Sequence, residues 1–414
     1  MTAIVGVLNK HAVAIAADSA VTMGNTHKVI NSANKIFTLS KYNPVAVMTY
    51  NNAAFMGVPW DIIIKEYRRQ LGEKSLSSVE EYMTNFIDFL HIRHFFSDEK
   101  TQHNAIISTL DTIYNLCHDE ILQEKGVPVE SQTCEQIEEK LNQYLEKLKI
   151  EPKCIEFEKH TFEEFEIYAK TDISNYVKNN NIKDETLLAK VTYYYLSAKY
   201  IQPFYTGLVF VGYGEEEIYP SLYPIKISLG INNRLKYFIE TNRIAKISEH
   251  GSSAIIAPFA QTDVIQTIIR GINPSFQNII YKIVDKSIRF YSKAITDILD
   301  KNADTLELSS AIKGLNKDLV INNTISDIKQ EMFNLYSKPL IDTVVLLDKE
   351  DMANMAESFI SLTSLVRRMQ PGEETVGGPV DVAVISKGDG FVWINRKHYF
   401  KPELNASFFS NYFK

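Results

Sequence analysis

The chain has 414 residues, of which 45% are hydrophobic and 23% charged, a composition typical of a globular protein with a sizeable core. The formal net charge of −7 argues against a nucleic-acid partner, because phosphate binding requires a basic face. The three cysteines have no CxxC spacing and indicate neither a disulfide framework nor a zinc site. No segment approaches the ~20 apolar residues of a membrane-spanning helix, and the first residues lack the pattern of a signal peptide. The sequence thus predicts a soluble, cytoplasmic protein.

The first 50 residues have the pattern of short strands. Apolar runs at Thr2–Leu8 and Ala12–Ala17 flank the polar turn Asn9-Lys10-His11, which predicts a hairpin. Both runs are almost entirely apolar, as expected of strands that are buried on both faces. The segments 35–39 and 44–50 predict two further strands.

A long helical region follows. From Ala53 to Leu71, apolar residues recur at helical spacing, so Pro59 must lie in the first turn of a helix or cause a kink in it. Five more amphipathic helices are predicted before residue 204, at Ser78–Phe96, Asn104–Leu122, Glu135–Leu148, Phe162–Val177 and Glu185–Tyr200.

Strand patterns return at 207–213, 222–228 and 235–239, and a second helical block covers 263–337. The predicted helix Met352–Met369 then precedes two final strands, Val380–Ser386 and Gly390–Ile394. Blocks of strands therefore alternate with blocks of helices. This order indicates an α+β fold rather than an alternating parallel one.

The residue after the first methionine is a threonine. Methionine is normally removed when the next residue is small, so the mature chain would begin with Thr2. An N-terminal threonine combines a hydroxyl nucleophile with its own α-amino group, whose pKa of about 7.7–8.0 lets it accept a proton at neutral pH. Many cytosolic proteins begin with Met-Thr, so the prediction of a catalytic Thr2 depends on the residues that follow it.

Those residues resemble the start of proteasome β subunits, and still more that of the proteasome-like peptidase of the bacterial heat-shock protease. The resemblance lies in the strand from Thr2, the strand end Ala16-Ala17-Asp18-Ser19, the segment Gly24-Asn25-Thr26 and Lys35. In that family the threonine lies beside a buried aspartate and a buried lysine, which implies these roles for Asp18 and Lys35. A lysine near the hydroxyl lowers its pKa, and the aspartate compensates the burial of the ammonium group.

The segment from Val47 to Ala54 resembles the part of the family where a strand ends in two glycines and a backbone N–H forms the oxyanion hole. Here Asn51 and Asn52 replace the glycines. A backbone donor survives the replacement, and Asn tolerates left-handed backbone geometry better than most residues. The resemblance therefore assigns the oxyanion donor to Asn51.

Two more segments resemble parts of the family that surround the terminal amine. The turn His250-Gly-Ser-Ser-Ala resembles a glycine–serine turn whose serine completes the hydrogen-bond network, which points to Ser252. Before the pair Gly377-Gly378 the family has an acidic residue and a serine, and the matching positions hold Glu373 and Val376. Glu373 can take the acidic role, whereas Val376 has no hydroxyl.

The resemblance covers residues 2–71, 205–270 and 350–395, in the family's order. It implies the four-layer αββα sandwich of the N-terminal-nucleophile (Ntn) hydrolases, in which two antiparallel sheets pack face to face between helices. The chain 1–414 would then be one such domain, enlarged by helical insertions at 72–204 and 271–345.

These expectations favour a threonine-type Ntn hydrolase that cleaves peptide or amide bonds and is activated by removal of Met1. One alternative is a proteasome-like scaffold with weak or no catalysis whose insertions bind a protein partner. The departures at Asn51, Asn52 and Val376 favour that scaffold. A small-molecule amidase of the same superfamily is the third interpretation.

The expected partners are a peptide or protein substrate and, through the insertions, further copies of the chain or a dedicated protein. No nucleic-acid or membrane partner and no cofactor are expected. His91 and His94 are one helical turn apart but lack the HExxH arrangement, so no metal site is predicted.

Overall fold

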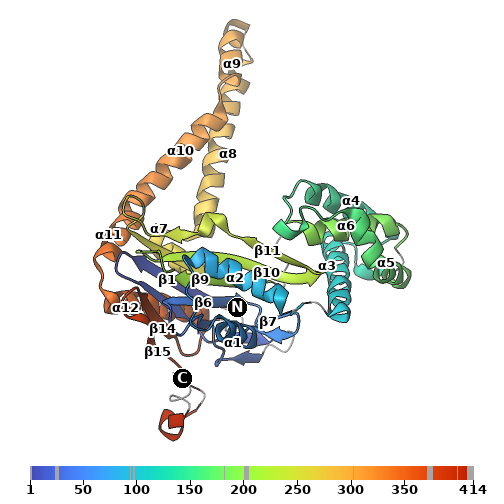
Figure 1. Cartoon of the computed structure of the whole chain (residues 1–414). Helices are drawn as coiled ribbons and strands as arrows, with labels where there is room; N and C mark the ends of the chain where they lie inside the picture. The colour runs from blue at the N-terminus through green and yellow to red at the C-terminus, as the bar shows by residue number, and fades with distance from the viewer. Residues whose placement is uncertain are drawn as a thin grey trace. The chain divides into compact units, whose positions relative to one another are not determined.

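The computed structural model describes residues 2–23, 28–93, 95–96, 98–180, 182–199, 205–301, 303–370, 376–398 and 400–407 (Figure 1). The chain divides into two compact units. Unit 1 comprises Met1–Ala33, Ile247–Val384 and Trp393–Lys397, and unit 2 comprises Asn34–Lys246, Ile385–Val392 and His398–Lys414. None of the described helices has both the length and the apolar character that crossing a bilayer requires.

Unit 1 is built on a five-stranded sheet with the strand order β13-β1-β2-β14-β15. Its strands are β1 (Ala3–Asn9), β2 (Val13–Ala17), β13 (Ala254–Ala260), β14 (Asp381–Ser386) and β15 (Gly390–Asn395). A separate short pair, β3 (Val21–Met23) with β4 (Lys28–Ile30), follows β2. Strand β1 pairs antiparallel with both of its neighbours, with Ala3 opposite Ala260 and Ile4 opposite Ala17. All residues of β1 and β2 are buried, which explains why both read as continuous apolar runs.

Helices cover one face of this sheet. They are α7 (Asp263–Arg270), α11 (Lys338–Leu346) and α12 (Lys349–Met369). Val5, Val7 and Ala14 pack in one cluster with Phe359 and Ile360 of α12. Residues that alternate with these on the strands, such as Ile4, Leu8 and Ile15, are also completely buried, so both faces of the sheet are covered.

A long helical hairpin, α8 to α10, separates α7 from α11 in unit 1. It consists of α8 (Pro274–Leu299), α9 (Leu306–Lys313) and α10 (Lys317–Met332), and a π-helical segment (Phe333–Ser337) leads into α11. Helices α8 and α10 lie side by side, with α9 at the far end (Figure 1). Asn273 caps the start of α8 by accepting a hydrogen bond from the N–H of Ser275, and Pro274 occupies the first turn, where no N–H is needed.

Unit 2 contains a second sheet, with the strand order β11-β10-β9-β6-β5 and β12 paired to β10. The strands are β5 (Ile36–Thr38), β6 (Val45–Asn51), β9 (Thr206–Gly212), β10 (Ser221–Ile231), β11 (Arg234–Ile239) and β12 (Ala245–Lys246). The short pair β7 (Ala54–Phe55) and β8 (Val58–Pro59) precedes the helices α1 (Trp60–Leu71) and α2 (Val79–Ile92). These helices cover one face of the sheet through an aromatic cluster that includes Trp60, Tyr67, Phe86 and Phe210.

The remaining helices of unit 2 form a bundle with its own core. It contains α3 (Glu99–Lys125), α4 (Cys134–Lys149), α5 (Phe162–Asn179) and α6 (Glu185–Ser197). Thr133 and Thr161 begin α4 and α5 with capping boxes, which satisfy the first N–H groups of both helices. Short 3₁₀ turns occur at Val129–Ser131, Ile155–Phe157, Thr241–Arg243, Ala303–Thr305 and Pro402–Leu404.

Most of the predicted helices and strands agree with these elements, but β13, α11 and the short strand pairs β3–β4 and β7–β8 were not predicted. Pro59 does not lie in the first turn of α1 but caps it from β8, because residues 54–59 form a tight strand pair before the helix begins. Within the predicted insertion 72–204, α2 shares the core of α1 and the sheet, whereas α3 to α6 pack on one another. The α+β class with two sheets agrees with the prediction.

Candidate active site

Thr2 lies immediately before β1, with 4% of its surface exposed. Its carbonyl accepts a hydrogen bond from the N–H of Gln261, which follows β13, at 3.1 Å. On the other side, the next residue, Ala3, pairs with Asp18 at the end of β2. Thr2 is therefore held between the ends of two neighbouring strands of one sheet.

Asp18 binds backbone groups from three parts of unit 1. Its Oδ1 accepts a hydrogen bond from the N–H of Ala3 at 2.9 Å. Its Oδ2 accepts from the N–H of Ala20 at 3.1 Å and from the N–H of Gly377 at 3.3 Å. Ala3 is joined to Asp18 twice, because its carbonyl also accepts from the N–H of Asp18 at 3.1 Å. The buried carboxylate thus fixes the backbone of the residue that follows Thr2.

The segment after α12 returns to this site through Gly377 and Gly378. The N–H of Ser19 donates to the carbonyl of Gly377 at 3.0 Å, and the hydroxyl of Ser19 donates to the carbonyl of Pro379. Gly378 has φ +74°, and a Cβ there would lie 3.0–3.3 Å from atoms of Asn31 and Ser19. Glycine suits position 378, because a side chain would be strained at this backbone angle and would crowd its neighbours.

The sequence did not predict the polar cluster of Gln261, Asp263 and Arg367 near Thr2. The side chain of Gln261 accepts a hydrogen bond from Arg367 of α12, and the same guanidinium pairs with Asp263 at the start of α7. Ala260, opposite Ala3, has φ +61°, a left-handed conformation that is uncommon for alanine. These residues shape the strand end beside Thr2, and no local sequence motif marks them.

The prediction for Ser252 is wrong in position. Ser252 lies two residues before β13, whose first residue, Ala254, pairs with Asn9 at the far end of β1. Thr2 lies at the opposite end, so about 20 Å of strand separates it from Ser252. Because β13 runs antiparallel to β1, its last residues approach Thr2 and its first residues do not.

Lys35 and Asn51 belong to unit 2 and lie at one end of its sheet. Lys35 directly precedes β5 and is 3% exposed, and its carbonyl accepts a hydrogen bond from the N–H of Thr49 at 2.8 Å. Thr49 is two residues before Asn51 on β6. The backbone positions of Lys35 and Asn51 are therefore near neighbours at this end of the sheet.

Asn51 ends β6 in the left-handed region, with φ +72°, as the sequence analysis allowed for an asparagine in place of glycine. Its side-chain amide donates to the carbonyl of Tyr205 at 2.8 Å, and the N–H of Asn52 reaches the same carbonyl at 3.3 Å. The carbonyl of Asn52 in turn accepts from the hydroxyl of Thr206 at 3.1 Å. These bonds hold the two asparagines against the start of β9.

Tyr50, the residue before Asn51, contacts an ion pair that is largely screened from solvent. The hydroxyl of Tyr50 donates to Glu240 at 3.2 Å, and Lys226 forms an ion pair with the same carboxylate at 2.9 Å. Burial, with the negative charge of Glu240, raises the pKa of Tyr50 far above its ordinary value. Gly207 leaves room for the ring, because a Cβ there would lie 1.9 Å from the Tyr50 side chain.

The left-handed angle at Asn51 can be tested by substitution. We expect Asn51→Val to lower the free energy of unfolding by about 2 kcal/mol, because a β-branched residue is strained at positive φ and the bond to Tyr205 is lost. Asn51→Gly, which suits this angle, is expected to change it by less than about 1 kcal/mol. Urea unfolding of both variants measures the difference, and equal losses would show that backbone strain is not the cause.

The other predicted positions fall outside the described residues or are packed in the core. Met1, Gly24-Asn25-Thr26 and Glu373 lie outside the described residues. Val376 is completely buried in the cluster between the sheet of unit 1 and α12. Over the parts of the chain that the structure covers, no group of three or more His, Cys, Asp or Glu side chains is arranged to hold a metal ion.

Comparison with known proteins gave similarity to solved structures alone. No protein-family model and no curated protein matches the chain. One similar structure is an Anbu mutant from Hyphomicrobium sp. strain MC1, with 9% identity, a TM-score of 0.26 and coverage of 100% of this chain and 95% of that one. Another is Anbu, described as an ancestral beta-subunit, from Yersinia bercovieri, with 8% identity, a TM-score of 0.27 and coverage of 99% and 94%.

Proposed function

We propose that the protein is a threonine-type Ntn hydrolase that cleaves peptide or amide bonds, with Thr2 as its nucleophile after removal of Met1. The observation that carries the proposal is the position of Thr2 at the start of the buried inner strand β1, where the buried carboxylate of Asp18 binds the next backbone N–H at 2.9 Å. A terminal nucleophile needs such an anchor, because the end of a chain is otherwise poorly ordered.

The four-layer αββα arrangement is part of this proposal. In each unit, helices cover one face of the sheet, and the side chains on the other face are buried as well. Val209, Val211 and Met48 illustrate this for unit 2, as Ile4 and Ile15 do for unit 1. In the proposed four-layer arrangement, a further layer covers this apolar face of each sheet.

In the proposed mechanism, Thr2 Oγ attacks the carbonyl carbon of the substrate and transfers its proton to the α-amine of Thr2 or to Lys35. The backbone N–H of Asn51 binds the oxyanion. The C–N bond then breaks, the departing amine takes the proton, and an ester links the acyl group to Thr2. Water hydrolyses that ester and restores the hydroxyl.

Lys35 keeps its proposed role as a group that exchanges a proton with Thr2, and its side chain is almost completely buried. Glu373 keeps its proposed role beside the terminal amine, whereas Ser252 is no longer part of the site.

Intact-mass analysis of the full chain tests the proposal. We expect the purified protein to lack Met1 and to gain the mass of one peptide epoxyketone, an electrophile that reacts with both the hydroxyl and the amine of an N-terminal threonine. Thr2→Ala should gain no mass, and Thr2→Ser should still react, because serine keeps both groups.

Retention of Met1, or equal labelling of the wild type and Thr2→Ala, would contradict the mechanism. If Met1 is absent and no labelling occurs, the scaffold interpretation is favoured instead. Circular dichroism of Thr2→Ala provides the control, because removal of one hydroxyl and one methyl group should leave the fold unchanged.

A further inference from the structure

The hairpin of α8 and α10 has an exposed apolar stripe that its own helices do not cover. Phe276, Ile283 and Phe290 follow one another at intervals of seven residues along α8, and Ile279 and Ile298 lie on the same side of the helix. All five are exposed, and Phe290 leaves 71% of its surface open. This spacing is that of a seam at which a second helix packs.

The hairpin buries little of its own apolar surface. Gln277 and Thr296 are the only buried residues among the 26 of α8, all of which are described, and Ile321 is the only one in α10. Helices of this length normally depend on packing of an apolar face. A face left open along about 39 Å of helix therefore suggests that another element covers it.

A groove lies beside the stripe, toward the far end of the hairpin. It has a volume of about 750 Å³ and opens between α8 and the segment that joins α9 to α10. Its apolar lining includes Ile288, Tyr291, Ile295, Ile312, Leu315 and Val320. A groove of this kind can receive a large apolar anchor from a helix that lies along α8.

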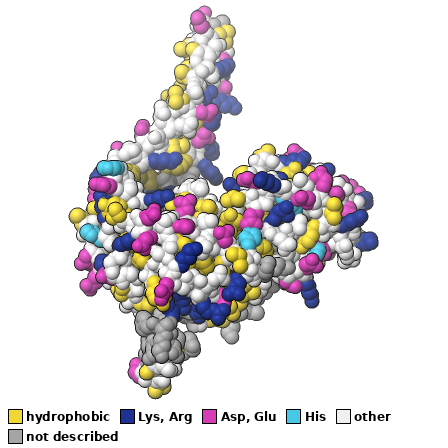
Figure 2. Space-filling model, viewed as in Figure 1, with side chains coloured by type: hydrophobic (Ala, Val, Ile, Leu, Met, Phe, Trp, Pro, Cys, Tyr) yellow, Lys and Arg dark blue, Asp and Glu magenta, His cyan; other side chains and the backbone are white. Residues whose placement is uncertain are grey.

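Lysines border the stripe and the groove. Lys282, Lys286 and Lys293 lie along the edge of α8 that faces away from the groove, and Lys317 contributes to the groove lining. In Figure 2, basic side chains with acidic ones between them follow one edge of this extension, beside the hydrophobic ones. Within the described parts of the hairpin, Asp285 and Asp318 pair with Arg289, and Asp300 pairs with Lys313.

From this pattern we propose that the hairpin binds an amphipathic helix of a partner protein, whose apolar side chains cover the stripe and fill the groove and whose acidic side chains face Lys286 and Lys293. The proposal does not depend on catalysis by Thr2. Charge complementarity favours this partner. An acidic edge would pair with the lysines, a neutral helix would leave them without an opposite charge, and a basic helix would repel them.

Two other occupants fit the charges less well. In an antiparallel pair of α8 helices from two copies of the chain, the same edges meet, so Lys286 and Lys293 would face each other. In a parallel pair of α8 helices, the lysine edge of one helix would have to meet the opposite edge of the other, which faces its own α10. An anionic membrane would attract the lysines, but its uniform negative surface would also meet Asp297 next to Ile298, whereas a partner helix can place an uncharged polar residue there.

Fluorescence anisotropy with designed peptides tests the proposal on the full chain. The probe is a labelled helical peptide of about the length of α8, with leucines in a heptad seam and glutamates along both edges. We expect Phe290→Ser to weaken its binding about tenfold or more, since exposed aromatic anchors carry much of such interfaces. Ile167→Ser, at another highly exposed isoleucine on α5, is the matched control and should bind as the wild type does.

A charge exchange makes the test specific. The double variant Lys286→Glu with Lys293→Glu should lose the glutamate-edged peptide and bind a twin peptide that has lysines at the edges. Equal binding of both peptides, or no binding of either, would overturn the proposal. Two further results would also overturn it: dimerisation in analytical ultracentrifugation, or co-sedimentation with phosphatidylserine vesicles, if Phe290→Ser abolishes the effect. A second copy of the chain or a membrane would then be the occupant of the stripe.

Discussion

An Asp18→Asn variant is expected to lose epoxyketone labelling at Thr2 and to unfold with about 3 kcal/mol less free energy than the wild type. The carboxylate accepts hydrogen bonds from the N–H groups of Ala3, Ala20 and Gly377. An amide replaces one acceptor oxygen with an NH₂ group, which would point at an N–H donor in a buried site. Loss of a charge-assisted acceptor with a donor left unsatisfied has a cost of this order.

Urea unfolding and intact-mass labelling measure the two effects separately. Asp119→Asn, at an exposed position on α3, is the matched control and should change neither. Thr2→Ala should lose labelling without the loss of stability. If Asp18→Asn keeps the stability of the wild type, the carboxylate does not hold the strand ends together, even if labelling is lost. If stability falls and labelling persists, Asp18 anchors the fold but is not needed for a reactive Thr2.

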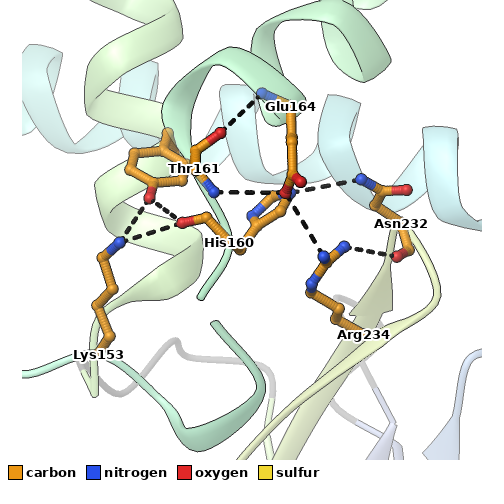
Figure 3. Close-up of polar contacts among 7 residues, drawn as sticks. Lys153, His160, Thr161, Glu164, Asn232 and Arg234 are labelled. Atoms are coloured by element: carbon orange, nitrogen blue, oxygen red, sulfur yellow. Dashed lines mark hydrogen bonds and ion pairs between the residues drawn. The ribbon is translucent and has the colours of Figure 1, made fainter. Parts of the chain in front are cut away.

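The helical bundle of unit 2 is expected to lose stability as the pH falls from about 6.5 to about 4, through His160. Burial lowers the pKa of His160 from 6.5 to about 4, and the positive charges of Arg234 and Lys153 add to this effect, while Glu164 opposes it (Figure 3). Nδ1 of this ring has no hydrogen-bond partner among the described residues, and Nε2 is 3.4 Å from the side-chain amide of Asn232. The neutral ring is therefore the form that the folded bundle accommodates.

The sign of the effect follows from proton binding. Above about pH 6.5 the histidine is neutral in both states and contributes no pH dependence. Between pH 6.5 and 4 the unfolded chain binds a proton that the folded chain does not. The free energy of unfolding therefore decreases as the pH decreases, by about 3 kcal/mol in total. Below about 4 the folded state binds the proton as well, and this contribution levels off.

Unfolding of the full chain at about pH 7 and about pH 4.5 measures this contribution. His160→Phe keeps an aromatic ring against Phe157, Phe165 and Tyr193 and removes the titrating group. We expect its pH dependence over this range to be flatter than that of the wild type. His11→Phe, at an exposed position, is the control. An equal slope in the wild type and His160→Phe would contradict the assignment to His160.

The local pattern of the sequence determined most elements of this protein. The hairpin of β1 and β2 could be predicted because two apolar runs flank a polar turn, and both of its strands are buried on both faces. The helices α2 to α6 could be predicted because their apolar residues recur every three or four positions. The left-handed angle at Asn51 is compatible with the sequence, because asparagine tolerates this geometry better than most residues.

The tertiary structure alone decided which distant residues meet. Strand β13 pairs antiparallel with β1, which brings Gln261 to Thr2 and leaves Ser252 at the other end of the sheet. The bond between Gly377 and Asp18 joins residues that are 359 positions apart. Neither contact has a local signal, because strand direction and register are set by the packing of whole sheets and not by neighbouring residues.

The same limit applies to Thr2 and to the helical hairpin. The sequence indicated that 271–345 is helical, but the spacing of apolar residues is the same whether a seam is buried in the chain or open to a partner. Only the folded structure distinguishes these cases, by leaving Phe290 exposed and Ile321 buried. Likewise, the sequence proposed Thr2 as a nucleophile from its place in the chain. The structure added its position between two strand ends, with the carboxylate of Asp18 bound to the residue that follows it.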